Sequence, residues 1–159
     1  MRKIVFLLAF VAHSFLFAED SPLVCKGEVP WMSDEFKGGP RYFVLASSSY
    51  GSLFFGDNKT VEIDKKNKII KIWTIVFESY KSRDEIVKKY GQTNASLGYT
   101  KNFEVFDITN KKVKTLTSTD YTCNGNLIKS FSDESKWNYI IPDSVGEGKF
   151  ETIKQKYGL

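Results

Sequence analysis

The stretch Ile69–Phe77 constrains the fold of this chain more than any other part of the sequence. It reads Ile-Ile-Lys-Ile-Trp-Thr-Ile-Val-Phe, so β-branched and aromatic residues fill most of its positions. Successive side chains of a strand point to opposite faces of a sheet. Because apolar residues occupy both odd and even positions here, both faces need cover. The stretch therefore predicts a central β-strand.

Shorter runs on either side also have the composition of strands. They are residues 41–45, 53–55, 60–64, 103–109, 113–121 and 127–132. Polar turns separate them, at residues 65–68 and 110–112 among others. Asn124-Gly125 is the strongest hairpin signal and predicts a type I′ turn, which needs a positive φ at both central residues. The pattern indicates strands joined mainly by short hairpins.

Two segments have the period of a helix. Ser82 with Glu85 three residues later matches a capping box, and Gly91 supplies a stop, which predicts a helix of about two turns. A second helix begins at Pro142-Asp143-Ser144. It places three apolar residues on one face: Phe150, Ile153 and Tyr157. We predict an α+β fold, a single antiparallel meander sheet with a short middle helix and a C-terminal helix packed on the sheet.

The beginning of the chain has the composition of a secretion signal. A short basic region precedes an apolar run, and Ala18 is followed by two acidic residues. A signal at residues 1–18 leaves an irregular, glycine- and proline-rich lead-in at 19–40 and one domain at 41–159. The alternative is a membrane anchor, although the apolar run is shorter than the about 20 residues of a span. We expect export to the periplasm or the cell surface, with no membrane span after cleavage.

Cleavage of the signal removes the single histidine, His13. A Ser-His-Asp or Cys-His site needs the imidazole as a base, and most zinc sites use it as a ligand. Paired carboxylates are a catalytic option without histidine, but Asp64, Asp107 and Asp120 are scattered over predicted strands. We therefore predict that the protein is not an enzyme and has no catalytic, cofactor or metal site.

Cys25 and Cys123 both lie after the predicted signal. In an oxidising compartment we expect them to form a disulfide. The bridge would close a loop of roughly 100 residues, which the chain-entropy model values at about 4–5 kcal/mol. Two alternatives stay open. Cys25 could carry the lipid of a lipoprotein, although Pro22-Leu23-Val24 matches such a site poorly, or both thiols could be free.

Lysines are concentrated on two predicted turns. Five of them are Lys65, Lys66, Lys68, Lys111 and Lys112. If both turns lie at one end of the sheet, these lysines form a basic rim suited to an acidic protein or a polyanion. The alternative is solvated turns that protect strand edges from aggregation. The net charge of +4 falls to +2 when Arg2 and Lys3 leave with the signal, so we predict no nucleic-acid partner.

A set of segments in the second half of the chain carries a resemblance to a known family. They are Thr117-Ser118-Thr119, Asn124-Gly125, Ser130-Phe131-Ser132, Trp137 and Pro142-Asp143-Ser144-Val145-Gly146-Glu147. In order and spacing they resemble the surface-adhesin protein E family. Upstream, Val61-Glu62-Ile63-Asp64 with Ile72-Trp73 is similar to the first hairpin of that family, and Phe103 to Asp107 to its middle strand. The similarity covers about residues 42–153.

The resemblance implies a secreted or surface-exposed bacterial domain with an antiparallel sheet and a helix. It also implies binding of host matrix or serum proteins and an ability to form a homodimer. The matched positions to which it assigns structural roles are Asp64, Trp73, Ser118, Phe131, Trp137, Pro142, Ser144 and Gly146. Many relatives carry one cysteine just after the aspartate that Asp107 matches and another in the final helix, and both are absent here. A bridge from Cys25 to Cys123 would replace that one.

These inferences lead to a prediction of an exported, adhesin-like binding module for a protein partner. The alternative is a periplasmic structural or accessory protein. The two tryptophans could contact a ligand, but we expect them to be structural. Trp73 should be buried in the central strand, and Trp137 should pack beneath the terminal helix.

Overall fold

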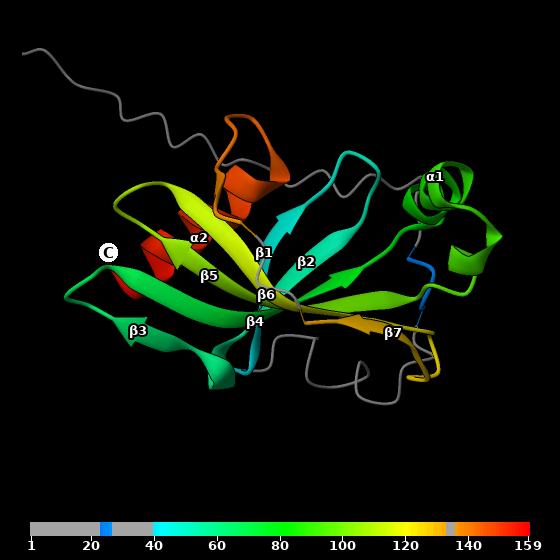
Figure 1. The fold of residues 1–159 in the computed structure, drawn as a ribbon, viewed down its shortest axis with the longest axis horizontal. Helices are drawn as coiled ribbons and strands as arrows, with labels where there is room; N and C mark the ends of the chain where they lie inside the picture. The colour runs from blue at the N-terminus through cyan, green and yellow to red at the C-terminus, as the bar shows by residue number, and fades with distance from the viewer. Residues whose placement is uncertain (1–22, 27–39, 133–135) are drawn as a thin grey trace, which may run out of the picture.

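The computed structural model describes residues 23–26, 40–132 and 136–159. The predicted signal and most of the lead-in lie outside the described residues. The described residues form an eight-stranded sheet with two α-helices (Figure 1). In chain order the elements are β1 (Tyr42–Ser47), β2 (Leu53–Asp57), the 3-10 turn η1 (Asn58–Thr60), β3 (Glu62–Asp64), β4 (Ile69–Phe77), α1 (Tyr80–Tyr90), the 3-10 turn η2 (Gln92–Asn94), β5 (Tyr99–Asp107), β6 (Lys112–Tyr121), β7 (Leu127–Phe131), β8 (Asn138–Tyr139) and α2 (Val145–Tyr157).

Strand β4 is the centre of the sheet, as its sequence predicts. Every strand pair is antiparallel, in the order β1-β2-β4-β5-β6-β7. Strand β5 pairs with β4 along its whole length, and β2 and β3 share the other side of β4. In the same way β7 and β8 pair with different parts of β6. The predicted α+β fold is confirmed.

Side chains from both faces of β4 are buried. On the face toward α2, Ile70 and Ile72 pack with Phe106 of β5 and with Phe150 and Ile153 of α2. This face is called the α2 face below. On the opposite face a second cluster gathers four aliphatic or aromatic side chains around Cys25: Phe55, Ile75, Phe77 and Tyr99. Full burial of such a side chain contributes about 1.5–3 kcal/mol, so β4 is held in place from both sides.

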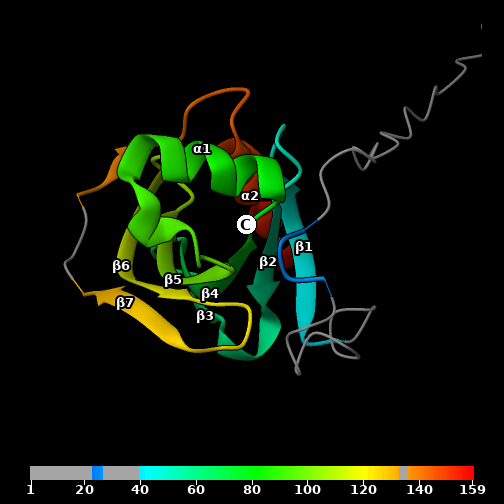
Figure 2. The same ribbon diagram turned by 90° about the vertical axis from the view of Figure 1, so that its right-hand side faces the viewer.

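The two helices lie on the same side of the sheet. The sheet curves, with α1 lying across its open side and α2 behind it (Figure 2). Ser144 caps α2 by accepting a hydrogen bond from the Glu147 N–H, and Gly158 ends the helix in the left-handed conformation. Phe150 and Ile153 are fully buried, and Tyr157 packs against their cluster. The predicted C-terminal helix and its packing on the sheet are therefore confirmed.

The predicted start of the middle helix is wrong. Helix α1 begins at Tyr80 and has 11 residues, with Ser79 rather than Ser82 as its N-cap. The Ser79 hydroxyl accepts the Ser82 N–H at 3.1 Å and itself donates to the carbonyl of Tyr50. The Ser82 hydroxyl instead donates to Glu78. Because Ser79 has a partner in the β1–β2 loop, the helix begins three residues earlier than the capping box predicts.

The hairpin at Asn124-Gly125 is present, but its turn type differs from the prediction. Only Gly125 has a positive φ, at 82°. Thr122 and Asn126 pair across the turn, and the Gly125 N–H bonds to the carbonyl of Thr122 at 3.0 Å. These bonds describe a three-residue loop that ends in a left-handed glycine. A type I′ turn would also need a positive φ at its first central residue.

Candidate functional site

The two lysine-bearing turns lie side by side at one end of the sheet. Asp107 pairs with Ile69 of β4 and with Lys112 of β6, which aligns the β3–β4 and β5–β6 turns. The Ile108 N–H donates to the carbonyl of Lys68 across the gap, at 3.0 Å. Figure 1 shows both turns at the end of the sheet away from α1. The placement that a basic rim requires is therefore present.

Both turns have the same internal structure. Each follows the pattern Asp-x-x-Asn-Lys, at residues 64–68 and 107–111. In the first, the backbone N–H and the side-chain amide of Asn67 donate to the two carboxylate oxygens of Asp64, at 3.0 and 2.6 Å. In the second, Asn110 bonds to Asp107 in the same way, at 2.9 and 2.8 Å. The fifth residue is left-handed in both turns, with φ of 54° at Lys68 and 50° at Lys111.

Local hydrogen bonds keep the two turn carboxylates ionised. Bonds from the backbone and side chain of Asn67 lower the pKa of Asp64. At Asp107, partial burial raises the pKa, but the bonds from Asn110 outweigh it, so the pKa is also below its ordinary value. The carboxylates therefore act as turn supports and are already occupied by the asparagines.

The rim lysines form no close ion pairs with acidic side chains among the described residues. Lys65, Lys66, Lys68 and Lys111 are exposed, and Lys112 is half-buried. None of the five forms an ion pair with a described carboxylate, whereas other lysines do. Lys71 on the next strand, for example, lies 3.3 Å from Glu62. The rim is thus a local excess of positive charge on ordered turns.

Two aromatic residues and one isoleucine form an exposed strip beside the rim, called the aromatic strip below. The prediction for Trp137, which belongs to this strip, is wrong. The strip consists of Trp137, Tyr139 and Ile141, which are 40%, 71% and 68% exposed. Trp137 does not pack beneath α2. The ammonium of Lys114 lies 5.2 Å from its ring centre, and the ammonium of Lys112 lies 4.5 Å from that of Tyr139. Strand β8 pairs with the start of β6, and the strip therefore lies next to the rim.

Trp73 is half-buried rather than enclosed in the core. Its ring stacks on Phe103 of β5, with 5.3 Å between ring centres. Its neighbours along β4, Ile72 and Thr74, are fully buried on the α2 face. Because side chains alternate between the two faces along β4, Trp73 lies on the opposite face. There its ring and that of Phe103 form a cross-strand pair on the surface of the sheet.

The other positions to which the resemblance assigns structural roles lie in several places. Asp64 and Ser144 support a turn and a helix start, as described above. Phe131 on β7 is 56% exposed, with the Lys129 ammonium 5.4 Å from its ring centre. Pro142 is exposed before α2, and Gly146 is in its first turn. Ser118 of β6 lines a pocket on the α2 face. These residues do not form one site.

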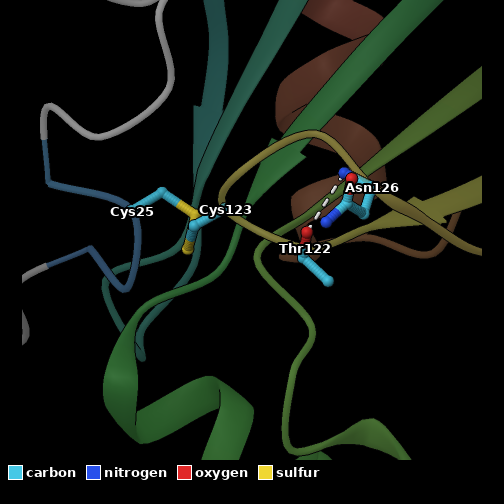
Figure 3. The surroundings of a disulfide bond; sticks show 4 residues. All are labelled: Cys25, Thr122, Cys123 and Asn126. Atoms are coloured by element: carbon cyan, nitrogen blue, oxygen red, sulfur yellow. Dashed lines mark hydrogen bonds between the residues drawn. A yellow bond between two sulfur atoms is a disulfide. The ribbon is translucent and has the colours of Figure 1, made fainter.

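The predicted disulfide between Cys25 and Cys123 is present (Figure 3). It joins residues 98 positions apart and leaves neither sulfur free or available to a lipid. The bridge holds residues 23–26 against the end of β4, where the Val24 N–H donates to the carbonyl of Glu78 at 2.9 Å. Gly98 makes room for it, because a Cβ there would lie 2.6 Å from the Cys25 sulfur.

A buried polar cluster on the α2 face is absent from the predictions. Lys149 of α2 and Glu104 of β5 are 8% and 6% exposed, and the Lys149 ammonium lies 2.7 and 2.6 Å from the two carboxylate oxygens. The hydroxyl of Thr74 also donates to Glu104, at 2.6 Å. The sequence contains a signal for one member of this pair, since Glu104 interrupts the apolar residues Phe103, Val105 and Phe106 of β5. Nothing in the sequence indicated that the two would meet.

A pocket of about 370 Å³ opens beside this cluster. Its walls come from the β1–β2 loop, β2, β4, β5, β6 and the start of α1. The carboxylate of Glu78 lies in the pocket wall and is 8% exposed. It accepts hydrogen bonds from the hydroxyls of Ser52 and Ser82, at 2.9 and 2.5 Å. No sequence pattern indicates this site, because its residues are far apart in the chain.

The three aspartates considered for catalysis do not converge. Asp64 and Asp107 are bound to asparagines in the turns, and Asp120 lies at the other end of β6, 3.3 Å from Lys129.

In the part of the chain that the structure describes, no cluster of three or more histidine, cysteine or acidic residues is arranged to hold a metal. No helix among the described residues is long and apolar enough to cross a membrane. No family model, curated protein or solved structure matches the chain.

Proposed function

We propose that the protein is an exported, non-catalytic binding module that holds an acidic protein partner on the basic rim. The observation that carries the proposal is the side-by-side placement of the two Asp-x-x-Asn-Lys turns. Five lysines that form no ion pair with a described carboxylate lie on or next to these turns. Such a local charge excess attracts acidic surfaces and orients their approach.

The aromatic strip supports a protein as the partner. Tryptophan and tyrosine are enriched among the residues that contribute most to protein interfaces. Trp137 and Tyr139 are exposed, and Tyr139 lies beside the rim lysine Lys112, so apolar area and positive charge occur side by side. A partner that is acidic and presents some apolar surface would use both. The resemblance to the surface-adhesin protein E family makes host matrix or serum proteins the first candidates.

The rim is tested by charge reversal with a matched control. Lys65→Glu with Lys66→Glu changes the charge of the rim, and Lys88→Glu with Lys89→Glu makes the same change on exposed residues of α1. Binding to purified matrix and serum proteins is measured at low and physiological salt. We expect the rim variant to lose at least tenfold in affinity and most of the salt dependence, and the α1 variant to keep both. Equal affinities for the two variants would refute the rim as the contact surface.

Export and location are tested separately. Mass spectrometry of the non-reduced mature protein is expected to find an N-terminus at Glu19 and no lipid. On intact cells, digestion by an added protease is expected for an adhesin. Full protection would instead support the periplasmic structural or accessory role.

A further inference from the structure

We propose that the pocket on the α2 face binds a small, uncharged, hydroxyl-rich ligand of about the size of a monosaccharide. The pocket lies between the start of α1 and the sheet, away from the basic rim. Its volume of about 370 Å³ falls in the range of small-molecule sites. The inference does not depend on the proposed partner of the rim.

The lining of the pocket is mainly polar. Serine or threonine hydroxyls come from the β1–β2 loop, α1, β5 and β6, and Asn102 adds an amide that can both donate and accept. Ser118 of β6 lies directly opposite Asn102 in the β5–β6 pairing, and Thr100 lies two residues from Asn102 on the same face of β5. Polar side chains on the concave face of a sheet occupy positions that apolar core residues could fill, and they bury less apolar surface. Their convergence on one open volume is the arrangement of a polar ligand site.

Glu78 is the most informative residue in the lining. Its described hydrogen bonds go to one oxygen, Oε2, which accepts both serine hydroxyls. No described lysine or arginine forms an ion pair with it. Glu104, which is buried to a similar extent, has both oxygens bound by Lys149. The second oxygen of Glu78 is therefore available to accept hydrogen bonds from ligand hydroxyls.

The charges around the pocket select against ionic ligands. The carboxylate of Glu78 repels anions. Lys149 is neutralised by Glu104, but the ammonium of Lys81 lies 5.2 Å from the Tyr50 ring in the wall and disfavours a cation. A hydroxyl-rich molecule can donate to Glu78 and exchange bonds with Asn102. The Tyr50 ring is 44% exposed and can cover an apolar face of a sugar ring.

The pocket is held in shape by hydrogen bonds between its own walls. The Ser79 N–H donates to the Ser52 hydroxyl at 3.3 Å, and the Ser79 hydroxyl donates to the carbonyl of Tyr50. The Ser52 N–H in turn donates to the hydroxyl of Ser48, at 3.0 Å. These bonds attach the β1–β2 loop to the start of α1. A pre-formed site of this kind loses little conformational entropy when a ligand binds.

The test is a titration of the mature, disulfide-bonded protein followed by amide NMR. The probes are glucose, galactose and N-acetylglucosamine, with choline as the cation probe and inorganic phosphate as the anion probe. We expect at least one sugar to shift the amide signals of Thr100, Asn102 and Ser118 in a saturable way, and choline and phosphate to leave them unchanged. Saturable shifts with choline or phosphate alone would refute the ligand class. The absence of shifts with all probes would refute the site.

Two variants connect binding to the pocket residues. Glu78→Gln keeps the size of the side chain and removes the charge, and Asn102→Ala removes the amide while leaving the Glu78 hydrogen bonds in place. We expect each to weaken sugar binding about tenfold, a change of about 1.4 kcal/mol. Glu85→Gln on the exposed side of α1 is the control and should bind like the wild type. Wild-type affinity in the folded Asn102→Ala variant would refute the assignment.

Discussion

Two pairs of carboxylates in this protein differ in where their partners come from. Asp64 and Asp107 lie in the turns at one end of the sheet, and each is bound by an asparagine three residues later. Glu78 and Glu104 lie on the α2 face and have partners 26 to 45 residues away, although Glu78 also accepts one bond from Ser82, four residues later. A local partner is present whenever the turn forms. A distant partner is present only when the whole domain is folded, so its loss should cost more.

The largest effect is expected at the buried ion pair. Lys149→Met keeps much of the side-chain volume but leaves Glu104 buried without its counter-charge, which should lower the free energy of unfolding by about 3–5 kcal/mol. The measurement is urea denaturation at neutral pH. Lys154→Met, on an exposed side of the same helix, should change stability by less than about 1 kcal/mol.

The double variant Glu104→Leu with Lys149→Met sharpens this result. Replacement of both charges by apolar groups should recover most of the loss, because no unpaired charge stays buried. If the single and double variants were equally unstable, packing of Lys149 rather than its charge would be the cause.

The disulfide is the second long-range connection. Cys25→Ser with Cys123→Ser should lower the free energy of unfolding by about 2–4 kcal/mol, because the bridge restricts a loop of 98 residues in the unfolded chain. Thermal and urea unfolding provide the measurement. The wild type under reducing conditions should match the variant. Equal stability of oxidised and reduced wild type would contradict a stabilising role.

A smaller effect of opposite sign is expected in the turns. Lys68 and Lys111 have left-handed backbones, which cost a side-chain-bearing residue about 1–2 kcal/mol. Lys68→Gly or Lys111→Gly should remove this cost and raise stability by about 0.5 kcal/mol after the added entropy of the unfolded glycine. Lys66→Gly, within the same turn but without a positive φ, should give no gain. A gain at Lys66 equal to that at Lys68 would contradict the explanation.

The smallest effects concern the turn carboxylates and pH. Their folded-state pKa values are lowered, so the stability they contribute is present above the unfolded pKa of about 4 and is lost as the pH falls through the folded value. Asn67→Ala should raise the pKa of Asp64, and Asn110→Ala that of Asp107, as followed by NMR titration. Asn138→Ala, whose amide bonds to a carbonyl instead, should leave both pKa values unchanged.

Much of the fold was predictable because its signals are local. The apolar pattern of β4, the cap at Ser144 and the hairpin at Asn124-Gly125 each depend on residues a few positions apart. The errors occurred where a distant contact decided between local options. Ser79 and Ser82 can both cap a helix, and the carbonyl of Tyr50 is a partner for Ser79. Trp137 was predicted to pack beneath the terminal helix, but it directly precedes β8, which pairs with the start of β6.

The sequence by itself determined the order of the elements, the turn positions and the lysines that the turns carry. These properties follow from hydrophobic period, capping and turn chemistry, which act over a few residues. Only the tertiary structure decided that the two lysine-bearing turns lie side by side, that Lys149 meets Glu104, and that Glu78 lines a pocket without an ion-pair partner among the described residues. The physical reason is that charge pairs and cavities depend on distances in space, which sheet register and helix packing set after the chain has folded.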